Sequence, residues 1–150
     1  MDSFRGKTQH TLDPKGRLII PARFRAVIKD SRQESLMLTT YAGAVYAYTM
    51  EEWDVVETEL KGARGPDVAD AKRLIIGSAM PCNLDKQGRI LIPKDHREYA
   101  GIDTDSEVTL IGIVEHFEIW QTARLQKINE AFEARRQNGE TAESLSKLGF

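Results

Sequence analysis

The sequence predicts an α+β fold built from two tandem repeats, and three observations support this. Residues 13–21 (DPKGRLIIP) recur at residues 85–93 as DKQGRILIP, an offset of 72 positions. The same offset aligns the strand candidates and an amphipathic helix farther along, so it marks a tandem duplication. A duplication of this kind predicts an architecture of two similar units. Each repeat core, about residues 5–60 and 77–132, is near the size at which a lone hydrophobic core is marginal. The two repeats are therefore expected to share one core.

Each repeat is expected to begin with a strand, a tight turn and a return strand. Residues 7–12 are a threonine-rich strand candidate, and residues 17–20 and 89–92 are apolar, β-branched return strands. Residues 13–16 fit a type I turn, because aspartate can bond the backbone two residues on, proline pre-sets the second position and glycine takes the left-handed one. In hairpins this is the three-residue connection with a glycine bulge. Residues 85–88 repeat the turn without the proline.

A short helix follows the return strand in each repeat. Pro21 and Pro93 end the strands and suit the first position of a helix. We therefore expect helices at residues 22–29 and 94–100, the second closed by Gly101 as its C-terminal cap. Further strands are expected in two pairs, residues 35–40 with 45–48 and residues 107–112 with 117–120.

An amphipathic helix ends each repeat. Residues 49–52 (TMEE) have the pattern of a capping box, so the first of these helices is expected to begin there. Apolar residues recur at helical spacing in both helices, and such stripes are interpreted as core. The stripe residues are Trp53, Val56 and Leu60 in the first helix and Leu125, Ile128 and Phe132 in the second.

These elements divide the chain into four expected parts. A break containing glycine and proline at residues 62–66 separates the repeats, and a connecting helix is expected at residues 67–76. After residue 132 the sequence becomes polar, with a weak helix at residues 144–148. The expected parts are a first repeat at 5–60 (core about 7–54), a connecting segment at 61–78, a second repeat at 79–132 (core about 83–126) and a polar tail at 133–150.

Charge is distributed unevenly along a chain whose net charge is only −2. Between residues 5 and 32 there are eight basic residues against two acidic ones, a local net charge of +6. The balancing acidic residues lie in the helix that begins near residue 50 and in the C-terminal part. Such segregation suits a local anionic partner such as nucleic acid, although charge alone fits a mixed solvated surface equally well.

Composition argues against several other classes of protein. A hydrophobic content of 41% and a charged content of 29% are ordinary for a globular protein. No apolar run approaches the roughly 18–20 residues that span a bilayer, and the first residues lack the apolar stretch of a secretory signal. The single Cys82 cannot form an internal disulfide and is interpreted as a buried small residue. We therefore expect a cytoplasmic protein with no membrane partner.

No pattern typical of an enzyme or a metal site occurs in the sequence. The three histidines, His10, His96 and His116, share no metal-ligand spacing with one another or with the cysteine. Nucleophile-elbow, phosphate-loop and dinucleotide fingerprints are absent. Asp13 and Asp85 could be imagined as paired catalytic carboxylates, but their turns already explain them. The sequence therefore predicts no cofactor, no metal, no small-molecule substrate and no enzymatic activity.

The arginine after each turn glycine is the strongest functional candidate. Arg17 and Arg89 directly follow Gly16 and Gly88, and strand alternation puts Ile19 on the same face as Arg17. Either arginine could form a salt bridge with the nearby aspartate, or it could project as a planar five-donor fork suited to guanine edges and phosphates. Four further basic residues would extend one DNA-binding surface, two in the turns and two in the helix that follows the first return strand: Lys15 and Lys86, and Arg23 and Arg25.

The combined pattern resembles a known family. Tandem copies of Asp-x-x-Gly-Arg-hydrophobic-x-Ile-Pro, preceded by Phe-Arg-Gly at residues 4–6, are similar to the MraZ family of bacterial transcriptional regulators. One copy would indicate only the broader SpoVT/AbrB-like group, whereas two copies at this spacing are much more specific. The second copy departs from the first, because residues 94–95 are Lys-Asp where residues 22–23 are Ala-Arg. The two copies are therefore not expected to contact DNA equally.

The resemblance implies a fold, partners and a function. The implied fold is a pseudo-twofold, swapped-hairpin AbrB-like β-barrel with flanking helices, in which one chain supplies both halves of what relatives build from a dimer. Ring-like homo-oligomers would bind repeated boxes of double-stranded promoter DNA on the nucleoid, through Asp13 to Arg17 and Asp85 to Arg89. The implied function is repression of the protein's own promoter and of the adjacent division and cell-wall gene cluster. The alternative is an antitoxin-like or scaffold oligomer that acts through protein–protein contacts.

Overall fold

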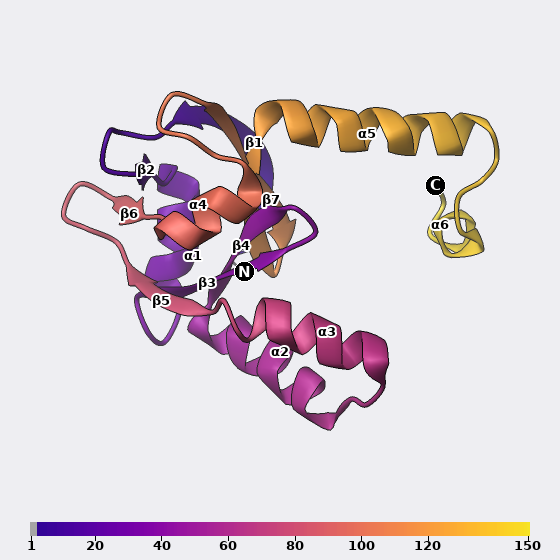
Figure 1. Ribbon diagram of the computed structural model, residues 1–150, viewed down its shortest axis with the longest axis horizontal. Helices are drawn as coiled ribbons and strands as arrows, with labels where there is room; N and C mark the ends of the chain where they lie inside the picture. The colour runs from indigo at the N-terminus through magenta and orange to yellow at the C-terminus, as the bar shows by residue number, and fades with distance from the viewer. Residues whose placement is uncertain (1–2) are drawn as a thin grey trace.

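The computed structural model describes residues 3–150, and within them the chain forms eight strands and six helices (Figure 1). The strands are β1 (Phe4–Thr11), β2 (Arg17–Ile19), β3 (Ser35–Tyr41), β4 (Ala44–Thr49), β5 (Met80–Asn83), β6 (Arg89–Leu91), β7 (Glu107–Val114) and β8 (His116–Gln121). The helices are α1 (Ala22–Asp30), α2 (Met50–Gly62), α3 (Pro66–Ile75), α4 (Lys94–Ala100), α5 (Thr122–Gln137) and α6 (Glu143–Lys147). Each strand and helix that the sequence predicts is present, with bounds that mostly differ by one to three residues.

Six strands form one antiparallel sheet, and the two return strands form a separate ribbon. The order in the sheet is β1-β7-β8-β4-β3-β5, and β2 pairs with β6. Exchanging each strand for its counterpart in the other repeat, β1 for β5, β3 for β7 and β4 for β8, gives the same order read backwards. The sheet is therefore pseudo-twofold symmetric, with the β4–β8 pair at its centre.

The first strand of each repeat pairs inside the other repeat. In the register of β1 with β7, Phe4 lies opposite Val114, and in that of β5 with β3, Cys82 lies opposite Leu36. The return strands also pair across the repeats, so the two arms of each turn do not form a local hairpin. Turn chemistry determines the bend but not the pairing partner of the strand that follows.

The sheet of residues 3–150 is open, with β1 and β5 at its edges, and the expected closed barrel is not present in this pairing. The β2–β6 ribbon and helices α1 and α4 contribute the opposite side of the core instead. They supply buried side chains including Leu18, Phe24 and Ile90. Covering one face with a second layer removes apolar surface from water without the strand tilt that closure requires.

Both repeats contribute to one hydrophobic core, as the small size of each repeat predicts. Phe4 of β1, Phe24 of α1 and Phe117 of β8 meet there, with ring centroids 5.1–5.3 Å apart. In the second repeat the position of Phe24 is taken by His96, which is only 3% exposed. The core is therefore shared between the repeats without being identical in its two halves.

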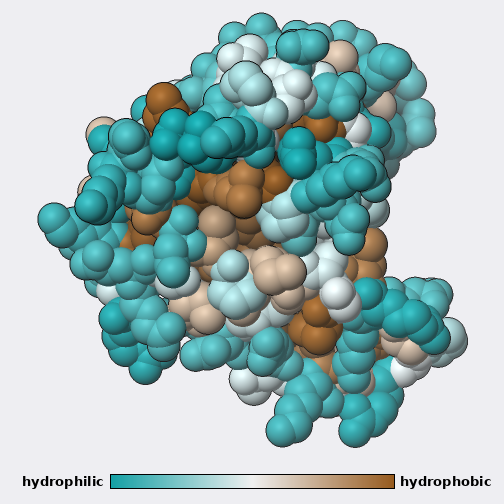
Figure 2. Space-filling model, turned by 60° about the vertical axis from the view of Figure 1, so that its left-hand side comes forward, coloured by the Kyte–Doolittle hydropathy of each residue, from teal (hydrophilic) through white to brown (hydrophobic). Residues whose placement is uncertain are grey.

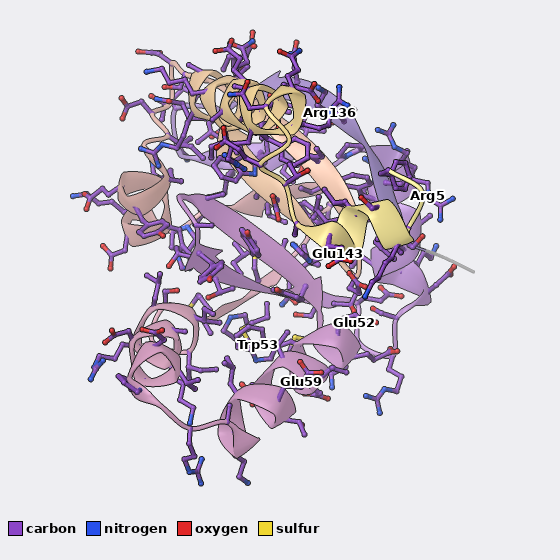
Figure 3. All side chains as sticks on the ribbon, turned by 90° about the vertical axis from the view of Figure 1, so that its right-hand side faces the viewer. Arg5, Glu52, Trp53, Glu59, Arg136 and Glu143 are labelled. Carbon is purple, nitrogen blue, oxygen red and sulfur yellow. The ribbon has the colours of Figure 1, made fainter. Side chains whose placement is uncertain are left out.

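The other face of the sheet is covered by the starts of α2 and α5. Trp53 of α2, labelled in Figure 3, is 2% exposed. The centroid of its ring lies 5.7 Å from that of Tyr48. Thr49 caps this helix, because its side chain accepts a hydrogen bond from the Glu52 amide at 3.3 Å. Leu125 of α5 is 7% exposed. The predicted helix start at Thr49 and the first part of each apolar stripe are thus confirmed, whereas of the capping box only the bond to the Thr49 side chain is found within residues 3–150.

Helix α5 then extends away from the sheet, with α6 at its far end (Figure 1). Ile128 is 44% exposed, so the interpretation of the whole second stripe as core is wrong. The reason is that no other part of the described chain covers the helix at that position. The helix also continues past Phe132 to Gln137, into the segment expected to be a polar tail.

Candidate nucleic-acid interface

The two predicted turns have the same hydrogen-bonded geometry. Asp13 Oδ1 accepts hydrogen bonds from the backbone amides of Lys15 and Arg17, each at 2.9 Å, and the Gly16 amide donates to the Asp13 carbonyl at 2.9 Å. The φ of Gly16 is 85°, a left-handed value that glycine adopts without strain. Residues 85–88 repeat these contacts, with two 2.9 Å bonds to the aspartate and a glycine φ of 77°. The sequence-based assignment of the turns is confirmed.

Each turn aspartate also holds the arginine that follows it. Arg17 Nε donates to Asp13 Oδ2 at 2.5 Å, and Arg89 Nε donates to Asp85 Oδ2 at 2.8 Å. Of the two arrangements that the sequence left open, the structure contains the salt bridge. The terminal amino groups of Arg17 have no hydrogen-bond partner within residues 3–150, so the pairing leaves donors of the guanidinium unused.

Asp13 connects the two repeats at this site. Arg89 Nη1 lies 3.7 Å from Asp13 Oδ2, so one carboxylate is within ion-pair distance of both arginines. The hydrogen bond from the Arg17 amide is the largest influence that lowers the pKa of Asp13, and the Arg89 amide likewise lowers the pKa of Asp85. Both carboxylates are therefore ionised at neutral pH and act as fixed anchors for the guanidinium groups.

The pairing of β2 with β6 brings both arginines onto one exposed face. The register sets Arg17 opposite Leu91 and Arg89 opposite Ile19, while the residues between them point into the core. We call the surface formed by Arg17, Ile19, Arg89 and Leu91 the ribbon face. It lies with both turns at the end of the molecule opposite α5 (Figure 1). Figure 2 turns this side towards the viewer and shows apolar surface set among hydrophilic side chains.

The ribbon face includes two residues that sequence reasoning did not select. Ile19 is 54% exposed and Leu91 is 55% exposed. Strand alternation already placed Ile19 on the face of Arg17, which is the signal that could have identified it. The contact between the two return strands could not be inferred from either repeat alone, because the strands are far apart in sequence.

Arg25 and Arg97, which the offset of 72 relates, each lie against the turn of the other repeat. Arg25 Nη1 donates to the Ile20 carbonyl at 2.6 Å, and a Cβ at Gly88 would lie 2.8 Å from Arg25 Cδ. Arg97 Nε donates to a backbone carbonyl at 3.1 Å, and a Cβ at Gly16 would lie 2.9 Å from its Cζ. The recurrence of this arginine in both repeats therefore has a structural explanation, namely support of the turns.

The remaining predicted basic residues are exposed, but they do not all lie at the turns. Lys15 and Lys86 are exposed at the turn tips. Arg23 lies against the beginning of β1, because its Nε donates to the Arg5 carbonyl at 3.3 Å and its guanidinium packs over Gly6. At about 3.3 Å per residue, Gly6 is about 20 Å along β1 from the turn. Arg23 and Arg5 thus form a second basic region apart from the ribbon face.

Other kinds of site have less support in residues 3–150. No group of three or more His, Cys, Asp or Glu side chains is arranged there to hold a metal ion. None of the helices in this range has the length and apolar character needed to cross a membrane. A cavity of about 490 Å³ lies between α2 and α3, but acidic and basic side chains such as Glu57 and Lys72 line it together. The ribbon face is the arrangement that joins functional candidates from both repeats.

Known proteins are similar in sequence to this chain along nearly its whole length. The model of the family described as "MraZ protein, putative antitoxin-like" matches twice, at residues 3–74 and 75–146. Curated relatives named "Transcriptional regulator MraZ" include one from Desulforapulum autotrophicum, 40% identical over 147 residues, and one from Desulfosudis oleivorans, 38% identical over 149 residues. A third, from Desulfitobacterium hafniense, is 36% identical over 149 residues. Each alignment covers 98% of this chain and 99% of the relative.

Two family matches that together cover residues 3–146, and relatives 36–40% identical over nearly their full length, agree with the duplication of the turn described above. The chain belongs to the MraZ family.

Proposed function

We propose that this chain is a sequence-specific, DNA-binding transcriptional regulator that acts without catalysis. It represses its own promoter and the adjacent division and cell-wall gene cluster. The observation that carries the proposal is the ribbon face, on which arginines from both repeats meet at one carboxylate. The name "Transcriptional regulator MraZ" shared by the relatives supports the same conclusion.

In this proposal the two arginines read bases and the turn lysines contact phosphates. A guanidinium can donate two parallel hydrogen bonds to the O6 and N7 atoms of guanine in the major groove, which a two-stranded β-ribbon can enter. Asp13 and Asp85 restrict Arg17 and Arg89 before DNA arrives, so less side-chain entropy is lost on binding. Lys15 supplies charge to the phosphate backbone from its turn, as does Lys86.

Arg25 and Arg23 also take part in the proposed DNA binding, but their geometry differs from that of the turn residues. Arg25 already donates to a backbone carbonyl beneath the second turn, so its contribution to DNA binding is to position that turn. Arg23 belongs to the basic region at the beginning of β1, where it would meet phosphates only on DNA that extends past the ribbon face. The first repeat then contacts DNA more extensively than the second, because Asp95 takes the equivalent position there.

We also propose that the chain assembles into ring-like homo-oligomers. Helix α5 extends from the sheet with an exposed apolar residue, Ile128, and β7 ends in exposed Ile113 and Val114. A ring would present many ribbon faces to repeated promoter boxes, and effective concentration would then convert weak single contacts into tight binding on the nucleoid. We further propose a swapped-hairpin architecture, with repeats at 5–60 and 79–132 joined by the segment 61–78, and the pairing of β1 and β5 with strands of the opposite repeat supports it.

The test is quantitative binding to the DNA upstream of the protein's own gene. Arg17→Ala and Arg89→Ala are each expected to weaken specific binding by about 5- to 150-fold, the equivalent of one bidentate base contact at roughly 1–3 kcal/mol. Lys15→Ala is expected to weaken specific and nonspecific binding alike. It should also lower the slope of log K against log salt by about 0.9 for each phosphate that the variant no longer neutralises.

Arg73→Ala is the matched control, because Arg73 is an exposed, ion-paired arginine on α3, away from the ribbon face. Binding by this variant should equal that of the wild type. Circular dichroism of every variant establishes that the fold is retained. If Arg17→Ala and Arg89→Ala fold normally and bind the promoter as tightly as Arg73→Ala does, the ribbon face is not the DNA-binding site.

A further inference from the structure

The ribbon face carries two aliphatic side chains to which the proposed function gives no role. Ile19 and Leu91 are both more than half exposed, and the offset of 72 makes them counterparts in the two repeats. A single exposed aliphatic residue on a protein surface needs no explanation. Here the same position is exposed twice, although the adjacent Leu18 and Ile90 are at most 1% exposed. The exposed pair is therefore a repeated feature of the ribbon face and not an isolated surface residue.

Strand pairing puts each aliphatic side chain beside both arginines. Ile19 lies opposite Arg89 and two residues after Arg17, and Leu91 has the reciprocal neighbours. Side chains on one face are about 4.5–5.5 Å apart across antiparallel strands and about 6.6–6.8 Å apart along a strand. The second spacing equals two base-pair steps of about 3.4 Å each. The ribbon face thus alternates cationic and apolar groups at spacings of between one and two base-pair steps.

Charge favours duplex DNA as the occupant of this surface. Arg17, Arg89 and the two turn lysines outnumber the carboxylates of Asp13 and Asp85, four positive charges against two negative ones, so a net positive face favours a polyanion over a second copy of itself. The major groove contains one apolar feature, the C5 methyl group of thymine. Building on the DNA binding proposed above, we propose that Ile19 and Leu91 read bases by contacting thymine methyl groups. These thymines lie within two base-pair steps of the guanines bound by Arg17 and Arg89.

Deoxyuridine provides the direct test, because it differs from thymidine only by lacking the C5 methyl group. Each thymine in a footprinted box of the upstream DNA is replaced singly by deoxyuridine, and affinity is measured by fluorescence anisotropy. Wild-type binding is expected to weaken by about fourfold at one or two positions in each box, which corresponds to one buried carbon at about 0.8 kcal/mol. Replacement at the other thymines should have no effect.

The double variant Ile19→Ser, Leu91→Ser is expected to bind thymine-containing and deoxyuridine-containing DNA equally. Its affinity for each should equal that of the wild type for the deoxyuridine-containing DNA. Each single serine variant should lose discrimination at only part of the positions, which keeps the test valid if the double variant fails to fold. Val55→Ser is the matched control, because Val55 is 50% exposed on α2, and this variant should discriminate like the wild type.

Each other outcome has a definite meaning. A wild-type protein that binds the promoter but never distinguishes thymine from deoxyuridine overturns this inference and leaves the DNA-binding proposal intact. Discrimination that survives both serine substitutions overturns the assignment to Ile19 and Leu91. A changed oligomer mass with unchanged discrimination identifies a second copy as the occupant and overturns it as well. Failure of the wild type to bind any part of the upstream DNA refutes the proposed function itself.

Discussion

The turn aspartates show how one side chain can serve both the fold and the site. Oδ1 of Asp13 accepts the two backbone hydrogen bonds that close the turn, and Oδ2 pairs with the guanidinium of Arg17. Asp85 and Arg89 repeat this division of labour. Because the carboxylate is needed for the bend, the arginine is positioned wherever the turn forms. The signature therefore couples local backbone geometry to the direction of the cationic side chain.

His96 is the buried titratable residue with the clearest consequence for stability. It occupies the position of Phe24 in the second repeat, and neither ring nitrogen has a hydrogen bond of normal geometry within residues 3–150. Burial is the largest influence on its pKa and lowers it below the ordinary value of 6.5, although the nearby backbone of Ser78 and Leu38 acts in the opposite direction. The charged form of this imidazole is therefore disfavoured in the folded protein.

We expect the free energy of unfolding to be largest above pH 6.5 and to fall as the pH drops from 6.5 towards the lower pKa of the folded state. The unfolded chain binds the proton first, so acidification favours unfolding. His96→Phe should remove this component, as urea unfolding between about pH 5 and 8 would reveal. His10, whose pKa burial also lowers, is present in both proteins and cancels in the comparison. Parallel pH profiles for the two proteins would contradict the prediction.

At the level of elements, the turns and the short helices support one another across the repeats. Helix α1 of the first repeat places Arg25 against Gly88, and helix α4 of the second places Arg97 against Gly16. Each β2 or β6 strand is only three residues long, so its position depends on these contacts and on its partner strand. Each turn of the site is therefore supported by a helix of the other repeat, and each return strand pairs with the return strand of the other repeat.

Gly88→Ala should destabilise the protein, because Gly88 has a φ of 77° and a Cβ there would lie 2.8 Å from Arg25 Cδ. The left-handed backbone alone costs roughly 1–2 kcal/mol for a residue with a Cβ, and the displaced arginine adds to it. Gly62→Ala is the control, since a Cβ at that helical position meets nothing within 4 Å. Urea unfolding should show a loss for Gly88→Ala only. Equal stability of the two variants would contradict both the backbone strain expected at residue 88 and the close contact with Arg25.

For the whole molecule, exchanged strands make the two repeats a single folding unit. Neither repeat contains a complete sheet, because β1 pairs with β7 and β5 pairs with β3. The ribbon between β2 and β6 and the shared core add further contacts across the repeats. The two halves of the ribbon face can therefore form only when both repeats are folded.

Thermal unfolding is accordingly expected to show one cooperative transition. Its enthalpy should be about 100 kcal/mol near 60 °C, from about 0.7 kcal/mol per residue, and calorimetric and van't Hoff enthalpies per chain should agree. Differential scanning calorimetry measures both values, and repeating it at several protein concentrations separates subunit dissociation from unfolding. Two resolved transitions, each with about half of the enthalpy, would show that the repeats fold independently.

The turns, the helix starts and the candidate arginines of this protein could be predicted from its sequence alone. The turn at residues 13–16, the helix after Pro93 and the capping box at Thr49 rest on interactions between residues close together in the chain, which local patterns report directly. The duplication likewise predicted a shared core and two equivalent arginines. The candidate arginines themselves needed no tertiary information, because each follows a turn whose geometry is local.

The tertiary structure decided which segments meet. Pairing of β2 with β6 joins residues from different repeats, and only this pairing creates the ribbon face and brings Arg89 within ion-pair distance of Asp13. The tertiary structure also places Arg23 beside β1, away from the turns, and leaves Ile128 of α5 outside the core. Strand partners and helix burial depend on the total apolar surface that the whole chain can remove from water, and no local sequence pattern contains that quantity.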